Sequence, residues 1–151
     1  MRVNFLICAA FAATLVSACD NVGSLTEKEL VTKAKDHVEQ GQLDAAVIEL
    51  KNVLQQHPKS MEASWLLGEV YLKLAYPEGA EKEFRRASSL GVTDASVLPV
   101  LARALLMGNK PKDVLELEST SSLPVEVSSQ LLASKGLAHL AMNDLLAAKK
   151  T

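Results

Sequence analysis

Cysteine is nearly absent from this chain of 151 residues. Its two cysteines, Cys8 and Cys19, both lie close to the N-terminus, so residues 20–151 contain no thiol. This distribution excludes a disulfide framework, a thiolate nucleophile and a cysteine-ligated metal site from the remainder of the protein.

Aromatic residues, glycine and proline are also scarce, and neither sign of charge dominates. The chain has one Trp, two Tyr and three Phe, and its five Pro and seven Gly are spread out as turn signals would be. Leu, Ala, Lys and Glu are abundant instead, which favours helices over strands. Sixteen basic residues stand against eighteen acidic ones without a basic cluster, which argues against nucleic acid as a partner.

The N-terminus has the form of an export signal. Arg2 precedes a continuous apolar stretch at 3–16. This stretch is too short to span a bilayer, because a transmembrane helix needs roughly 20 apolar residues. The four residues that end the signal resemble the lipobox of bacterial lipoproteins: Val16, Ser17, Ala18 and Cys19.

The lipobox resemblance implies a signal peptide at 1–18 and a lipidated tether at 19–25. The Cys19 sulfur would carry diacylglycerol. Each acyl methylene buried in the bilayer contributes about 0.8 kcal/mol to membrane binding, so fatty acids such as palmitate would anchor the protein permanently. Asp20 resembles the residue that retains lipoproteins at the inner membrane of enteric bacteria. We therefore expect a location on the periplasmic side of the bacterial envelope, with the inner membrane favoured over the outer. An ordinary secretory signal that contains a cysteine is the alternative.

A repeat of 34 residues organises the rest of the chain. Small residues recur where one helix must approach another closely: Ala34, Gly68, Ala102 and Gly136. A second series marks the turns: Gly41, Ala75, Asn109 and Asn143. A third series lies in the helix after each turn: Ala46, Ala80, Val114 and Ala148. Each unit is therefore expected to be helix, turn, helix, and the units lie near 27–60, 61–94, 95–128 and 129–151.

Start and stop signals place eight helices. Thr26 with Glu29 forms a capping-box pattern, and Ser60 is a good N-cap. Pro58 disfavours helical conformation in the residue before it, so a helix should end there. Pro77 instead suits the first position of a helix. The expected helices span 26–40, 43–56, 60–75, a segment from Pro77, 94–107, 111–118, 126–142 and a segment from Asp144.

Residues 61–94 match a known repeat most clearly. The first helix contains WLLGEVY, although Trp65 sits one place late, and Gly68 in this helix is expected to face Ala80. The pattern resembles the tetratricopeptide repeat, and the resemblance covers about 27–150. It implies an all-α fold, a tetratricopeptide-repeat solenoid at 26–151 with about four helix-turn-helix units, the last incomplete. Three residues of the second helix also follow the pattern: Ala80, Phe84 and Ala87.

Three further stretches, 45–54, 80–87 and 97–106, carry a closer similarity. Together with the lipobox they resemble the tetratricopeptide-repeat lipoproteins of the PEP-CTERM/exosortase system, which are typically longer. The resemblance implies a lipid-anchored adaptor that binds a protein or peptide during envelope protein sorting and exopolysaccharide export. An assembly factor for outer-membrane proteins or polysaccharide secretion, and a recruiter of a cell-wall enzyme, are the alternatives.

No group of residues has the pattern of a catalytic or metal site. His37 and His139 hold the same repeat position three units apart, so they cannot share a metal. The serines at 119–122 lack a glycine elbow and a paired histidine. The helical Glu and Lys residues fit a solvated face with i,i+4 pairs. We expect a protein that is not an enzyme, without cofactor, metal or small-molecule substrate.

The expected binding surface is the concave face of the solenoid, which the first helix of each unit lines. Trp65 has two interpretations, contact with a ligand or packing against the neighbouring repeat. By repeat register, the candidate groove residues are Lys35, Trp65, Glu69, Leu72, Lys73, Arg103, Leu106 and Met107.

The chain ends inside the eighth expected helix. A helix of so few residues is marginal, because nucleation is costly and few hydrogen bonds follow it. We therefore expect residues after about 143 to fray, and either a longer natural product or a partner that covers this end. Three leucines would lack a covering neighbour: Leu140, Leu145 and Leu146.

Overall fold

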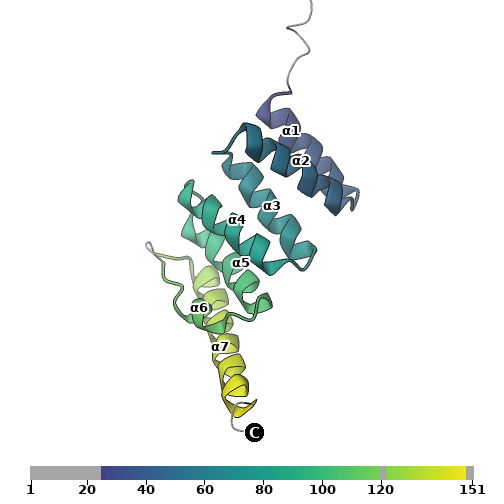
Figure 1. The fold of residues 1–151 in the computed structure, drawn as a ribbon. Helices are drawn as coiled ribbons and strands as arrows, with labels where there is room; N and C mark the ends of the chain where they lie inside the picture. The colour runs from purple at the N-terminus through teal and green to yellow at the C-terminus, as the bar shows by residue number, and fades with distance from the viewer. Residues whose placement is uncertain (1–24, 120–121, 149–151) are drawn as a thin grey trace, which may run out of the picture.

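The computed structural model describes residues 25–119 and 122–148, in which seven helices follow one another as a stacked array (Figure 1). The lipobox at 16–19 and Asp20 lie outside the described residues. All regular structure within the described ranges is α-helical, which confirms the expected fold class. The helices are α1 (Glu27–Glu39), α2 (Leu43–Gln56), α3 (Met61–Lys73), α4 (Pro77–Ser89), α5 (Asp94–Met107), α6 (Pro111–Leu115) and α7 (Val125–Ala148).

Side-chain caps fix the helix starts that the sequence indicates. The Thr26 hydroxyl accepts a hydrogen bond from the Glu29 N–H at 3.3 Å, and the Glu29 carboxylate accepts one from the Thr26 N–H at 2.7 Å. This backbone hydrogen bond is the main reason that the pKa of Glu29 is lowered. Ser60 likewise accepts from the Ala63 N–H at 3.2 Å and begins α3. The predicted capping box and N-cap are therefore confirmed.

The turns of the first three units share one backbone conformation. Gly41, Ala75 and Asn109 have positive φ angles of 73°, 53° and 54°. A helix begins two residues after each of them, at Leu43, Pro77 and Pro111. The predicted turn series is confirmed at these three positions.

The fourth expected turn is wrong, because Asn143 lies inside the continuous helix α7. Neither glycine nor proline lies near this position, and asparagine alone is also compatible with helix. The expected helices at 126–142 and from Asp144 are thus one helix of 24 residues, and the fourth unit has no internal turn within its described residues, 129–148. Helix α6, in contrast, is shorter than the expected 111–118.

The small-residue series is buried in the first three units and fails in the fourth. Ala34 and Ala102 are fully buried. A Cβ atom placed on Gly68 would lie 2.7 Å from Cε1 of Phe84, so Phe84, not the expected Ala80, is the close neighbour of this glycine. Gly136 has open space around it, and Ala138 is the buried small residue of α7.

One continuous apolar core runs through the array, with its largest fully buried side chain, Phe84, in α4. Helices α3 and α4 form the most extensively packed pair, and the other helices pack mainly on their neighbours in the chain, except that α5 also packs on α7. Ala46, Ala80 and Val114 are fully buried, as their shared repeat position predicts. Within the described ranges, no helix combines the length and apolar character needed to cross a membrane.

Candidate protein-binding surfaces

The first helices of successive units are joined at their surface by a charged pair. Lys35 of α1 donates to the Glu62 carboxylate of α3 at 2.5 Å, and both side chains are about half exposed. Lys35, a predicted groove residue, is therefore already paired with a carboxylate, and a ligand would have to share or displace that contact.

Two predicted groove residues on α3 are buried, Trp65 in part and Leu72 almost completely. Trp65 is partly buried and meets the Phe84 ring edge to face, with centroids 5.3 Å apart. Trp65 thus packs against α4 of its own hairpin. Leu72 is only 7% exposed, which leaves its side chain little to offer a partner. The structure corrects the orientation that the repeat register implied for Leu72.

The other predicted groove residues lie at the surface of α3 and α5. Lys73, Arg103 and Met107 are exposed, whereas Glu69 and Leu106 are partly buried. No ion pair within the described ranges joins Glu69 to Arg103. The two helices therefore present these residues separately, and their contact with a ligand stays a prediction.

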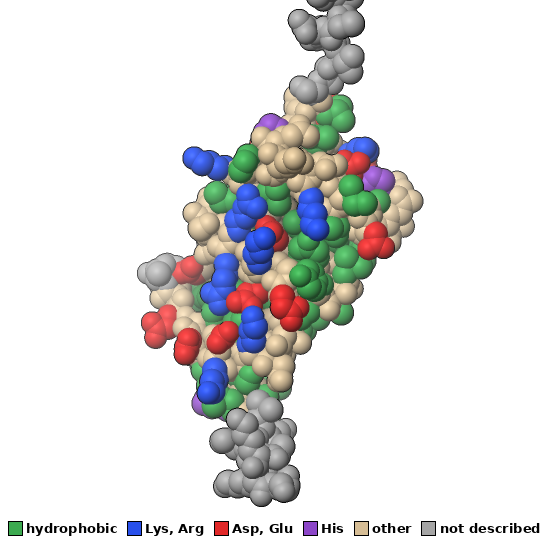
Figure 2. Space-filling model, in the orientation of Figure 1, with side chains coloured by type: hydrophobic (Ala, Val, Ile, Leu, Met, Phe, Trp, Pro, Cys, Tyr) green, Lys and Arg blue, Asp and Glu red, His purple; other side chains and the backbone are tan. Residues whose placement is uncertain are grey.

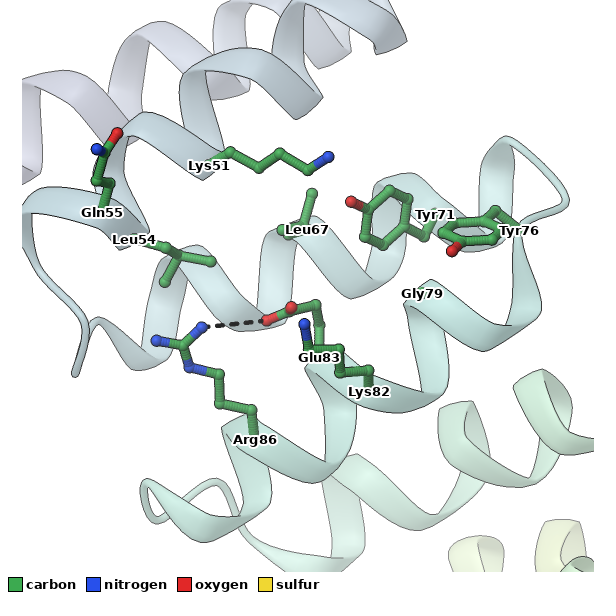
Figure 3. A pocket seen from close by; sticks show the side chains of 10 residues that line it. All are labelled: Lys51, Leu54, Gln55, Leu67, Tyr71, Tyr76, Gly79, Lys82, Glu83 and Arg86. Atoms are coloured by element: carbon green, nitrogen blue, oxygen red, sulfur yellow. Dashed lines mark ion pairs between the residues drawn. The ribbon is translucent and has the colours of Figure 1, made fainter.

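A pocket of about 420 Å³, which the repeat register did not indicate, opens between the second helices α2 and α4. Helix α3 forms its floor through Leu67 and Tyr71 (Figure 3). Tyr76, just before α4, meets Tyr71 edge to face with centroids 5.1 Å apart. The polar side chains that line it are Lys51, Gln55, Lys82, Glu83 and Arg86.

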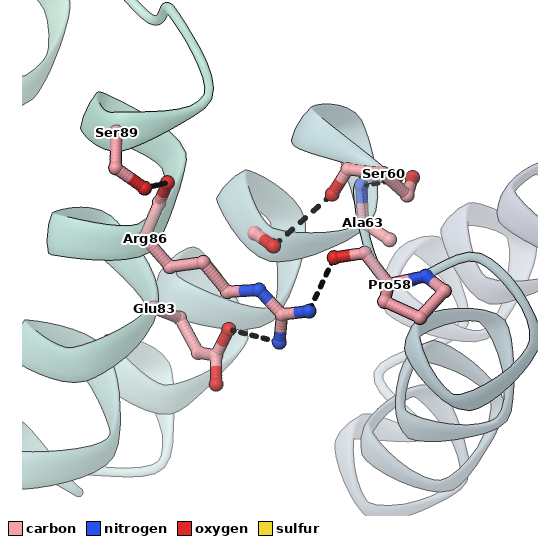
Figure 4. Close-up of polar contacts among 7 residues, drawn as sticks. Pro58, Ser60, Ala63, Glu83, Arg86 and Ser89 are labelled. Atoms are coloured by element: carbon pink, nitrogen blue, oxygen red, sulfur yellow. Dashed lines mark hydrogen bonds and ion pairs between the residues drawn. The ribbon is translucent and has the colours of Figure 1, made fainter.

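Glu83 is a buried carboxylate in this pocket, only 5% exposed. Its Oε2 atom has no hydrogen-bond partner within the described residues, and the nearest cation, Arg86 Nη1, is 3.8 Å away. The other terminal nitrogen of Arg86 donates to the Pro58 carbonyl at 2.5 Å (Figure 4). Arg86 thus ties α4 to the turn between α2 and α3, and leaves Glu83 Oε2 without a donor.

The sequence did contain a signal for the burial of Glu83. Ala80 lies three residues before Glu83 and Ala87 four residues after it, so all three share one helix face. Both alanines are fully buried. The prediction that the helical glutamates lie on a solvated face is wrong for Glu83.

A second charged group on α4 joins two repeat units. Glu81 accepts from Arg85 at 2.9 Å, an i,i+4 pair of the predicted kind, and from Lys110 at 2.7 Å. Burial raises the pKa of Glu81, but the hydrogen bonds from Lys110 and Arg85 outweigh it and hold the pKa below its ordinary 4.5. The hydrogen bond that Lys110 donates to Glu81 also raises the pKa of Lys110 above its ordinary 10.5.

We expect the Glu81 pairs to make stability depend on pH. Because the folded-state pKa is lowered, their contribution is complete above pH 4.5 and is lost as pH falls through the lowered pKa. Glu81→Gln should therefore lower the free energy of unfolding by on the order of 1 kcal/mol at neutral pH. The difference from wild type should shrink in acid, as urea unfolding at a series of pH values would show. Glu116→Gln, at an exposed position, is the control, and a Glu81→Gln difference that is constant with pH would contradict the assignment.

Comparison with known families matches residues 37–104 to the tetratricopeptide repeat, a segment that runs from the end of α1 into α5. With the helical array described above, the match identifies the fold as a tetratricopeptide-repeat solenoid. Comparison with curated proteins gave no match. Repeats of this family form surfaces for protein–protein interaction and typically act as scaffolds without catalysis. Within the described residues, no group of three or more His, Cys, Asp or Glu side chains could hold a metal ion.

Proposed function

We propose that this chain is a lipid-anchored, non-catalytic adaptor that binds other proteins on the periplasmic side of a bacterial membrane. The observation that carries the proposal is the stack of helical hairpins whose residues 37–104 match the tetratricopeptide repeat. Such stacks bury their apolar faces against each other and leave extended surfaces for partners. Exposed groups on α3 and α5, with the pocket between α2 and α4, are the surfaces available for this binding.

The anchor rests on the sequence around Cys19. A short apolar stretch followed by Val16, Ser17 and Ala18 supports cleavage before Cys19 and lipidation of its sulfur. Asp20 supports retention at the inner membrane. With the repeats held next to the bilayer, partners would be membrane proteins or exported proteins that pass close to it.

The pathway rests on the similarity of three stretches, 45–54, 80–87 and 97–106, to the lipoproteins of the PEP-CTERM/exosortase system. We propose that the adaptor serves the sorting of PEP-CTERM proteins and the export of exopolysaccharide. In this role the chain would bring an exported protein to the machinery that processes it.

One experiment tests the anchor and the partner together. The tagged full chain and its Cys19→Ser variant would be expressed in a host that carries the PEP-CTERM system, with in-cell crosslinking and recovery from membranes. We expect mass spectrometry to find a lipidated Cys19 N-terminus and crosslinked PEP-CTERM proteins for the wild type. The variant should accumulate as unlipidated precursor.

Each part of the proposal can fail separately in this experiment. An unlipidated mature N-terminus in the wild type would exclude the anchor. Crosslinks no different from those of an unrelated tagged lipoprotein would exclude the adaptor function. Specific crosslinks to other envelope proteins, without PEP-CTERM proteins or exopolysaccharide components, would retain the adaptor and reject the pathway.

A further inference from the structure

The pocket between α2 and α4 has an excess of positive charge. Lys51, Lys82 and Arg86 line it, and Glu83 is the only carboxylate among its lining residues. Figure 2 shows Lys and Arg side chains gathered on the face over α2 and α4. A pocket with this balance attracts an anionic ligand, and the effect is strongest at low ionic strength.

Two of these cations are available for a ligand. Within the described residues, no carboxylate lies within ion-pair distance of Lys51 or Lys82, and both side chains are exposed. Two other carboxylates of the same helices are already paired, because Glu49 accepts from Lys33 and Glu81 accepts from Arg85 and Lys110. Intramolecular pairing therefore does not neutralise the two lysines.

Glu83 places a second, independent requirement on the ligand of this pocket. Its Oε2 atom is buried without a donor, and a buried carboxylate oxygen that lacks a hydrogen bond is costly. Arg86 lies too far away, at 3.8 Å, to donate to it. The ligand that completes this pocket must therefore bring an N–H or O–H donor as well as negative charge.

An acidic peptide supplies both groups in one molecule. Its main-chain N–H groups are donors, and its side-chain carboxylates suit ammonium groups such as those of Lys51 and Lys82. The buried Tyr71 and the half-exposed Tyr76 offer an apolar wall beside these lysines. The pocket volume is also in the range of sites that enclose a few ligand groups rather than a whole domain.

We propose that the pocket between α2 and α4 binds an extended acidic segment of a protein partner. Carboxylates of the segment pair with Lys51 and Lys82, and a main-chain N–H donates to Glu83 Oε2. Arg86 is the nearest cation to Glu83 Oε2 and is itself held by the Pro58 carbonyl. This inference rests on the proposed adaptor function and assigns its partner a chemical class and a site on the second helices.

Binding of a labelled peptide of alternating Glu and Ser by the full chain in detergent would test the site. We expect Lys51→Glu with Lys82→Glu to weaken binding about tenfold or more, because two attractions become repulsions. The matched control is Lys28→Glu with Lys112→Glu, which changes the net charge equally at exposed positions outside the pocket. Equal weakening in both variants, or no binding to the wild type, would overturn the proposal. So would free glutamate or inorganic phosphate binding as tightly as the peptide.

A second measurement isolates the contact with Glu83. The same peptide with a methylated main chain keeps its carboxylates but lacks N–H donors. Methylation should weaken binding to the wild type about tenfold and should weaken binding to Glu83→Leu much less. Equal weakening in both would remove Glu83 from the site.

The crosslinking experiment separates this inference from the adaptor function. If the Lys51→Glu, Lys82→Glu variant keeps all envelope crosslinks of the wild type, the adaptor function stands and the pocket assignment is rejected. If the variant loses specific crosslinks while its melting temperature is unchanged, the pocket is the partner's site.

Discussion

Phe84→Ala is expected to lower the free energy of unfolding by about 3–5 kcal/mol, a typical loss for a buried phenylalanine. The Phe84 side chain is fully buried, meets Trp65 edge to face and lies directly over Gly68. Truncation would leave a cavity in the most extensively packed helix pair. Neighbouring helices could not fill it without breaking contacts on their other sides.

Urea unfolding followed by tryptophan fluorescence would measure the Phe84 effect, because Trp65 is the single tryptophan and lies against the altered site. Leu132→Ala is the control, since Leu132 is 69% exposed and its truncation should change stability by no more than about 0.5 kcal/mol. Similar losses for the two variants would mean that α4 does not pack as described.

Alanine substitution of Gly68 and Gly136, which hold the same repeat position, should change the stability of the protein in opposite directions. Gly68→Ala places a methyl group 2.7 Å from the buried Phe84 ring, so we expect a loss of about 1–3 kcal/mol. Gly136→Ala meets no atom within 4 Å, and alanine favours helix over glycine by up to about 1 kcal/mol, so this variant should be more stable.

Thermal unfolding of the two glycine variants under the same conditions would make the comparison. The double variant Gly68→Ala, Phe84→Leu should lose less stability than the sum of the two single losses, because the smaller side chain makes room for the methyl group. Two variants that shift the melting temperature in the same direction would contradict the structure at one of the two sites.

Local signals were sufficient to predict helices α1 to α5. Thr26, Ser60 and Pro77 act within a turn of the helix that they begin, so a single sequence displays their effect. The continuity of α7 was not predictable in this way. Asn143 resembles the earlier turn residues, yet whether it ends a helix depends on packing that no local signal records.

The candidate site was harder to predict than the fold, because α3 is buried on nearly all sides. Repeat register identifies which residues share a face of a helix. Most of the surface of α3 is buried, however, so few of its residues can belong to a binding surface. Repeat register therefore places Leu72 in a groove, although its side chain lies in the core. The pocket between α2 and α4 needs residues from three helices, and only the packed structure brings these together.

The packing of each helix mainly on its chain neighbours also has a consequence for how this protein folds. The extensively packed pairs, such as α1 with α2 and α3 with α4, are adjacent in the chain, and α5 reaches α7 only across the short α6. Contacts of this kind close short loops, so contact order is low and the entropic barrier to folding is small. Folding should begin at the α3–α4 hairpin, around Phe84, and spread outward in both directions by adding one helix at a time.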